Sequence, residues 1–260
     1  MDYRALFLDI DGTILTTDHK YSQATKQAIE QVQAKGIEVI VATGRPLHEI
    51  KTLTNELNIH SFIGYNGGYA TYNNKVIVNE SFDRQIIKQY LELSNEHGHE
   101  IVFYTSEKNY FTSLDKPLVQ QFIDCFELKY NEEFTPEIID QVVSITVMNV
   151  EKKHVALYEL TEEIRLEQVN IEGLGHSYDV IQTNVNKGKA IEKMMQHLNI
   201  KREQTIAFGD GLNDKQMLEV VGEGVAMGNA HPDLLPYAKH VTTSVEEDGI
   251  YHGLKKLGII

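Results

Sequence analysis

Two aspartates near the N-terminus are spaced so that they can act together. They lie in the string Asp9-Ile10-Asp11-Gly12-Thr13, which follows the apolar run Ala5 to Leu8. That run is typical of a strand buried on both faces, and residues two apart on extended backbone point to the same side. Carboxylates in such a pair can act as covalent nucleophiles or as oxygen ligands for Mg²⁺. The simpler alternative is an acidic turn after a strand.

Three further strings carry groups that could bind phosphate or metal. In Ala42-Thr43-Gly44-Arg45-Pro46, the Thr43 hydroxyl and the Gly44 N–H suit a phosphate oxygen near a helix N-terminus, and Arg45 could add charge. In Asn186-Lys187-Gly188-Lys189, a lysine at a helix start opposes the helix dipole, which suggests that it holds phosphate or balances the aspartates. A plain strand–turn–helix junction and a solvated linker lysine are the respective alternatives.

The last string, Gly209-Asp210-Gly211-Leu212-Asn213-Asp214, follows the apolar run Thr205 to Phe208. Oxygen ligands from separate strand ends are what Mg²⁺ needs, and ligands bind at the carboxyl edge of open α/β sheets. An acidic helix cap at Asn213 or Asp214 is the alternative, but it explains one residue rather than the whole string.

The elements that position these strings alternate between strand and helix at both ends of the chain. We expect strands at 5–8, 37–42, 62–64, 205–208 and 224–227, a hairpin over 69–78, and helices after Ser22, from Pro46, and over 189–198, 214–220 and 231–238. Short buried strands joined by helices predict a parallel sheet in an α/β domain.

The middle of the chain loses this alternation. A helix is expected over 85–96, strands over 101–104, 110–112, 142–150, 169–171 and 177–181, and a helix over 154–163. This mixture fits a separate α+β domain. We therefore predict a core made of residues 1–82 and 185–260, with residues 83–184 inserted as a second domain.

The chain has 260 residues and a formal net charge of −14, so it repels nucleic acid and anionic membranes. A phosphate site would need local positive charge. The single cysteine, Cys125, excludes an intramolecular disulfide, and we interpret it as a core residue. No segment has the length of a membrane span or a signal peptide, which favours a cytoplasmic protein.

The four strings, in this order, resemble those of the haloacid dehalogenase superfamily. The resemblance covers the whole chain, and the long insert between the second and third strings is similar to that of Cof-type phosphatases with a type II cap, of the IIB kind. The segment Gly224 to Ala230 also resembles that subfamily. The resemblance implies a Rossmann-like core and an inserted cap that acts as a lid.

It also implies a mechanism. Asp9 would attack phosphorus and form an aspartyl-phosphate, while Asp11 would act as general acid and then general base. The resemblance assigns Mg²⁺ to Asp9, Asp11 (through its carbonyl), Asp210 and Asp214, the last in an indirect role, and phosphate to Ile10, Thr43, Gly44, Lys187 and Asn213.

The substrate implied is a small organic phosphate monoester, such as a sugar phosphate, flavin mononucleotide or pyridoxal phosphate. A sugar phosphomutase of the same superfamily is the first alternative, and a non-catalytic regulatory module is the second, since fold alone does not prove activity. The sequence leaves the choice of substrate and the oligomeric state open.

Overall fold

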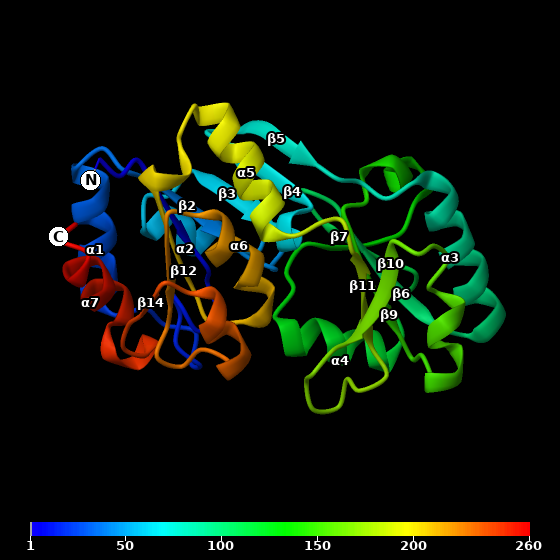
Figure 1. Ribbon diagram of the computed structural model, residues 1–260. Coiled ribbons are helices and arrows are strands. Elements are labelled where there is room, and N and C mark those ends of the chain that lie inside the picture. The colour runs from blue at the N-terminus through cyan, green and yellow to red at the C-terminus, as the bar shows by residue number, and fades with distance from the viewer. Residues whose placement is uncertain (1) are drawn as a thin grey trace. The chain divides into compact units, whose positions relative to one another are not determined.

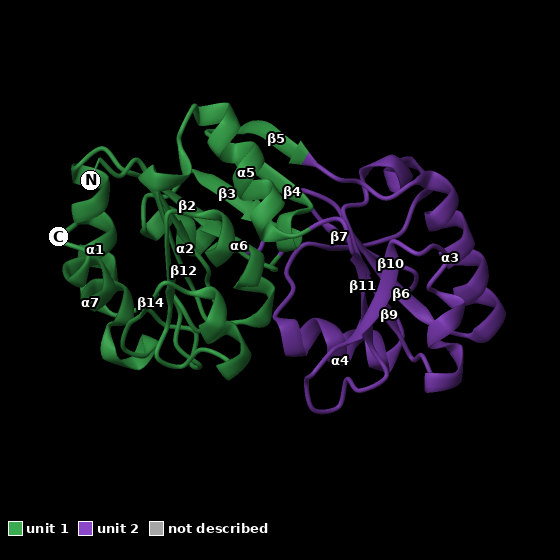
Figure 2. Ribbon diagram, viewed as in Figure 1, with its two compact units in different colours: residues 1–45, 51–78, 186–260 green, residues 46–50, 79–185 purple. Residues whose placement is uncertain are grey.

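The computed structural model describes residues 2–260 of the chain. They form two compact units, drawn in Figures 1 and 2. Within the described residues, unit 1 consists of 2–45, 51–78 and 186–260, and unit 2 of Pro46–Ile50 and Asn79–Val185. The α/β class with an inserted α+β part is confirmed.

Unit 1 is built on an eight-stranded sheet in the order β14-β13-β12-β1-β2-β3-β4-β5. All neighbours from β14 to β3 pair in parallel, and β4 joins β3 antiparallel. Its strands are β1 (Ala5–Leu8), β2 (Glu38–Ala42), β3 (Ser61–Gly64), β4 (Tyr69–Tyr72), β5 (Lys75–Asn79), β12 (Thr205–Gly209), β13 (Glu223–Ala226) and β14 (His240–Val241).

Helices cover both faces of this sheet (Figure 1). Phe7 and Ala207 face α5 and α6 and share a core with Ile191 and Met217. On the opposite face, Gly253 of α7 lies so close to the Phe208 ring that a Cβ there would be 2.4 Å from it. The helices are α1 (Gln23–Ala34), α2 (Lys51–Glu56), α5 (Lys187–Leu198), α6 (Lys215–Val220) and α7 (Gly249–Lys256).

The strand order of unit 1 reverses beside β1. From β1 the chain continues to β2 and β3 on one side, and after unit 2 it returns to β12, β13 and β14 on the other. Open α/β sheets bind ligands at the carboxyl ends of the strands at such a switch point. Asp9 directly follows β1 and Asp210 directly follows β12, so both begin at this place.

Unit 2 contains a six-stranded sheet in the order β10-β11-β9-β6-β7-β8, antiparallel except for the pair β7 and β8. It has its own hydrophobic core, in which Ile87 and Tyr90 of α3 pack against Ile101 and Val147. The elements are α3 (Arg84–His97), α4 (Pro117–Phe126), β6 (Glu100–Tyr104), β7 (Asn109–Phe111), β8 (Asn131–Glu133), β9 (Ser144–Met148), β10 (Ile164–Gln168) and β11 (Tyr178–Gln182). Short 3₁₀ turns also occur, among them η2 (Pro136–Gln141) and η3 (Lys152–Leu157).

The helix expected from Pro46 is wrong at its start, because α2 begins only at Lys51. Residues 46–50 form turns and belong to unit 2. There the Asn109 amide oxygen lies 2.8 Å from His48 Nε2, and the Asn109 amide nitrogen donates to Glu49 Oε1 at 3.0 Å. These contacts outweigh the local helical pattern. The chain therefore passes between the units at 45/46 and 50/51 as well as at 78/79 and 185/186.

The helix expected over 154–163 and the strand over 169–171 are also wrong. The 3₁₀ turn η3 covers the first region only as far as Leu157, turns and irregular chain follow it, and the strand forms earlier, as β10. Pairing explains the shift, because all five residues of β10 are in register with β11, from Ile164 opposite Gln182 to Gln168 opposite Tyr178. The segment 231–238 likewise contains the 3₁₀ turn η6 (Pro232–Tyr237) rather than an α-helix.

Cys125 is exposed, so its interpretation as a core residue is wrong. It lies in the last turn of α4, whose buried face is made by Val119 and Phe122. Among residues 2–260, no helix has both the length and the apolar character needed to cross a membrane.

Candidate active site

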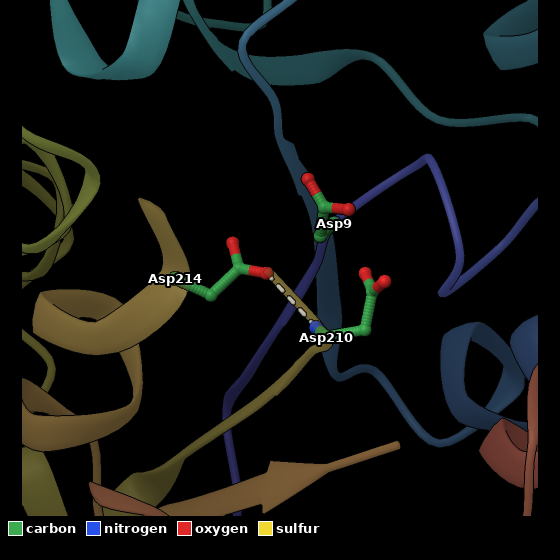
Figure 3. Close-up of side chains that lie close together, drawn as sticks. All are labelled: Asp9, Asp210 and Asp214. Atoms are coloured by element: carbon green, nitrogen blue, oxygen red, sulfur yellow. Dashed lines mark hydrogen bonds between the residues drawn. The ribbon is translucent and has the colours of Figure 1, made fainter. Parts of the chain in front are cut away.

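Three aspartates converge at the switch point of unit 1 (Figure 3). Asp9 follows β1, Asp210 follows β12, and Asp214 ends the 3₁₀ turn η5 (Leu212–Asp214) that leads into α6. Each offers a carboxylate oxygen, and these oxygens lie within 4.8 Å of one another. The structure thus brings together three of the four predicted metal ligands, from strings about 200 residues apart in the sequence.

Lys187 is completely buried beside these carboxylates. It is the first residue of α5, whose N-cap Asn186 accepts a hydrogen bond from the Lys189 N–H at 3.0 Å. The Lys187 ammonium donates to Asp9 Oδ1 and to Asp214 Oδ1, both at 2.6 Å. A solvated linker lysine is therefore excluded, and this lysine neutralises part of the acidic cluster.

Asp210 is held by its neighbours on two sides. The Thr13 hydroxyl donates to its Oδ1 at 3.1 Å, and the Asn229 amide lies 3.4 Å from its Oδ2. The same amide donates to the Gly12 carbonyl at 2.9 Å. A Cβ at Gly12 would lie 2.2 Å from Asp210 Oδ2, and φ at Gly12 is +80°, so the turn needs glycine for both reasons.

Asp11 lies apart from the trio. Its side chain is half exposed and accepts two hydrogen bonds from the Arg45 guanidinium, from Nε at 2.8 Å and from Nη2 at 2.6 Å. His19 Nδ1 lies 3.3 Å from the same Nη2. Its side chain is therefore not among the clustered oxygens, and only its carbonyl stays a predicted metal ligand. Arg45, which was expected only to add positive charge near the phosphate, is the direct partner of Asp11.

Thr43 and Gly44, two of the predicted phosphate-binding residues, follow the neighbouring strand β2. Thr43 follows β2, is buried, and accepts a hydrogen bond from the Arg45 N–H at 3.1 Å. Asn66, which sequence reasoning missed, lies beside Gly44 and accepts from the Asn213 amide at 2.9 Å. Asn66 follows β3 at the same sheet edge, and that position in the string Asn66-Gly67-Gly68 could have indicated it.

Ile10, the remaining predicted phosphate-binding residue, closes the turn after β1. Its side chain is fully buried, and its carbonyl accepts N–H groups of Thr13, Ile14 and Leu15. These bonds fix the backbone that connects Asp9 to Asp11. The role of the Ile10 N–H toward phosphate stays a prediction.

Burial sets the charge state of the cluster. Burial raises the pKa of Asp9 to about 8, and the charges of Asp214 and Asp210 act in the same direction, while Lys187 opposes them. Burial, followed by the charge of Asp214, raises the pKa of Asp210 to about 6. Burial alone would lower the pKa of Lys187, but the charges of Asp214 and Asp9 outweigh it and the pKa is raised. The cluster therefore favours added positive charge.

These residues fit a hard divalent cation. Three carboxylates and one ammonium leave a formal charge of −2, which such a cation would neutralise. Asp214 already accepts from Lys187 through Oδ1 and from the N–H groups of Asp210 and Gly211 through Oδ2 at 2.9 and 3.0 Å. Asp9 and Asp210 are therefore the better placed ligands, with Asp214 supporting the loop.

Comparisons with known proteins agree with this site. The sequence profile described as haloacid dehalogenase-like hydrolase matches residues 6–254. The chain is 35% identical over 264 residues to "Putative phosphatase YkrA" of Bacillus subtilis, covering all of both chains. A crystal structure of a hypothetical protein from Geobacillus kaustophilus has a TM-score of 0.91 at 29% identity and covers 99% of this chain and 100% of that one. The HAD subclass IIB sugar phosphatase BT4131 has a TM-score of 0.81 at 28% identity with the same coverage.

The chain belongs to the haloacid dehalogenase-like hydrolase family. The resemblance in the four strings is thus confirmed, and relatives named as phosphatases support phosphatase activity of the Cof type.

Proposed function

We propose that this chain is a Mg²⁺-dependent phosphatase that hydrolyses small organic phosphate monoesters through an aspartyl-phosphate on Asp9. The placement of Asp9 carries the proposal: it is buried, it directly follows β1 at the switch point, and its carboxylate lies beside Lys187 and Asp210. The sugar phosphatase among its structural relatives puts sugar phosphates first among the substrates, before flavin mononucleotide and pyridoxal phosphate.

In the first half-reaction, an Asp9 oxygen attacks phosphorus and the bond from phosphorus to the ester oxygen breaks. Asp11 gives a proton to that departing oxygen, so the alcohol leaves neutral. In the second, Asp11 takes a proton from water, which attacks the phosphorus of the aspartyl-phosphate. Inorganic phosphate leaves and the Asp9 carboxylate is restored.

Positive charge and N–H groups near Asp9 favour binding of the phosphate. Lys187 and Arg45 supply charge, and the Thr43 hydroxyl, the Asn213 amide and the backbone of Ile10 and Gly44 supply donors. Asp9, Asp210 and the Asp11 carbonyl would hold Mg²⁺, with Asp214 in support, and the ion would offset negative charge and orient the phosphate.

Arg45 donates two hydrogen bonds to Asp11, and the substrate phosphate can compete with Asp11 for this guanidinium. A phosphate dianion is itself a good acceptor for a guanidinium. Substrate that draws Arg45 away leaves the Asp11 carboxylate free to take its proton-transfer position. Arg45 thus links phosphate binding to the readiness of Asp11.

We further propose that unit 2 is the cap, which excludes water and selects the organic part of the substrate. We also propose the cytoplasm as its location, because a single cysteine is typical of proteins that need no disulfide.

One experiment separates this function from its rivals. The full chain is incubated with Mg²⁺ and a panel of sugar phosphates and phosphorylated cofactors, and both inorganic phosphate and rearranged sugar phosphate are measured. A phosphatase releases inorganic phosphate, whereas a phosphomutase yields the isomer. A regulatory module converts none of the panel, and that result would overturn the proposal.

A further inference from the structure

Three histidines of unit 2 gather at the C-terminal end of α3. None of them belongs to the sequence strings that form the candidate active site. His97 is the last residue of α3, His99 immediately precedes β6, and His154 lies in η3. Gly98, with φ of +69°, turns the chain between the first two, and the Asn149 amide donates to its carbonyl at 3.0 Å. The ring centroids are 4.6 Å apart for His97 and His154, 5.2 Å for His99 and His154, and 5.6 Å for His97 and His99.

These separations match those of imidazoles around one metal ion. In a tetrahedral site with metal–nitrogen distances near 2.0–2.1 Å, ligand nitrogens are about 3.3 Å apart and ring centres about 5 Å apart. His99 Nε2 and His154 Nδ1 lie 3.2 Å from each other. Two of the three rings thus already present nitrogens at ligand separation.

The other nitrogen of His99 has the partner that a metal ligand needs. His99 Nδ1 lies 2.8 Å from the Tyr158 hydroxyl, and Tyr158 is buried, with its carbonyl accepting from the Tyr90 hydroxyl at 2.7 Å. When Nδ1–H donates to the phenol oxygen, Nε2 carries the lone pair that faces His154. Metal-binding histidines are oriented by this kind of hydrogen bond.

His97 has to rotate its ring to complete the set. Within residues 2–260, Asp9, Asp210 and Asp214 are the one group of three His, Cys, Asp or Glu side chains whose ligand atoms all lie within 4.8 Å of one another. The three histidines do not meet this distance, so a nitrogen of His97 has to move toward those of His99 and His154. His97 and His154 are only partly buried, which leaves an entry path from solvent.

We propose that His97, His99 and His154 bind a divalent transition metal ion of the zinc class. Such an ion would join the end of α3, the start of β6 and the η3 turn. Imidazole nitrogen suits Zn²⁺, Ni²⁺ and Cu²⁺, whereas Mg²⁺ prefers oxygen. The chain would therefore hold two kinds of metal at two sites, and the second does not depend on the phosphatase activity.

The test is a Zn²⁺ titration of the full chain by calorimetry, with Mg²⁺ present in large excess to occupy the carboxylate site. We expect one Zn²⁺ site, weakened at least about tenfold by H97Q and by H154Q. H252Q is the matched control, since His252 is an exposed histidine of α7, and its binding should equal that of the unchanged chain. Circular dichroism of each variant checks that it is folded.

Cu²⁺ bound to the unchanged chain gives a second readout that needs no variant. Its electron paramagnetic resonance spectrum should show splitting from nitrogen nuclei. Histidines that merely pack together give a different result: no Zn²⁺ binding in excess Mg²⁺, or equal binding by H97Q, H154Q and the unchanged chain. Either of these outcomes, or a Cu²⁺ spectrum without nitrogen splitting, overturns the proposal.

Discussion

The ammonium of Lys187 lies 2.6 Å from a carboxylate oxygen of Asp9, although 178 positions separate the two residues in the sequence. The same ammonium lies 2.6 Å from Asp214. One buried lysine thus connects the end of β1, the loop after β12 and the start of α5. The candidate active site and the stability of unit 1 therefore depend on the same charge.

Replacing this lysine should destabilise the metal-free protein strongly. In K187M, the buried carboxylates of Asp9 and Asp214 lose their cation, and breaking a buried pair costs about 3–5 kcal/mol. Chemical unfolding in the absence of metal measures the loss. K189M, which changes an exposed lysine of the same helix, should cost far less. K187M/D214N should recover part of the loss, and equal stability of K187M and the unchanged chain would show that the pair is not important.

The two aspartates that we propose to be catalytic should respond differently to replacement by asparagine. D9N removes the proposed nucleophile, so turnover and phospho-enzyme should both disappear. D11N should still bind phosphate but lose roughly 10²–10⁴-fold in turnover, because it loses the proton donor and acceptor. Steady-state kinetics and mass spectrometry of acid-quenched enzyme measure these effects. A phosphoryl group found on any residue other than Asp9 contradicts the assignment.

Metal removal should abolish hydrolysis of a generic ester such as para-nitrophenyl phosphate. Without a cation, the cluster has a formal charge of −2 when its three carboxylates are ionised, and that charge repels the phosphate. Excess chelator should stop the reaction and added Mg²⁺ should restore it. D210N should need more Mg²⁺ for half-maximal rate, whereas D233N, an exposed aspartate of η6, should not. Full activity in excess chelator contradicts the proposed cofactor.

The apparent affinity for Mg²⁺ should rise with pH. In the metal-free protein the pKa of Asp210 is raised to about 6 and that of Asp9 to about 8, so protons occupy these groups at lower pH and compete with the metal. Affinity should therefore increase between about pH 6 and pH 8. Calorimetric titration with Mg²⁺ across this range measures it. An affinity independent of pH contradicts the charge state proposed for the cluster.

The same shifts affect folding without metal. The pKa of Asp9 is about 8 in the folded state, well above its usual value in an unfolded chain. Its contribution to the free energy of unfolding therefore falls as pH rises from about 4 to about 8. The rise in melting temperature caused by Mg²⁺ should then be larger at about pH 8 than at about pH 6. D9N should reduce this difference.

The two units should separate chemistry from selectivity. Each has its own hydrophobic core, so a chain in which residues 79–185 are replaced by a short linker should keep a folded unit 1 that binds Mg²⁺. It should discriminate poorly among phosphate esters, as measured by kcat/KM across a panel. Substitutions in exposed loops of unit 2 should reorder the panel, and a uniform loss on every ester would contradict a selective role for this unit.

The sequence by itself determined the core strands and the order of the four motifs that carry the candidate site residues. Runs such as Ala5 to Leu8 and Thr205 to Phe208 are local signals, because a strand buried on both faces must be apolar throughout. The polar residues that follow each run then have to lie at strand ends. The helix after Ser22 was equally local, since the Ser22 side chain caps it through the Thr25 N–H.

Only the tertiary structure decided which side chains meet. The two carboxylate contacts of Lys187, the fork of Arg45 on Asp11 and the contact of Asn66 with Asn213 join residues 27 to 178 positions apart. Strand order and register set such distances, and a local pattern does not contain them. The late start of α2 has the same cause, because residues 46–50, its expected first turn, belong to unit 2 and contact Asn109 there.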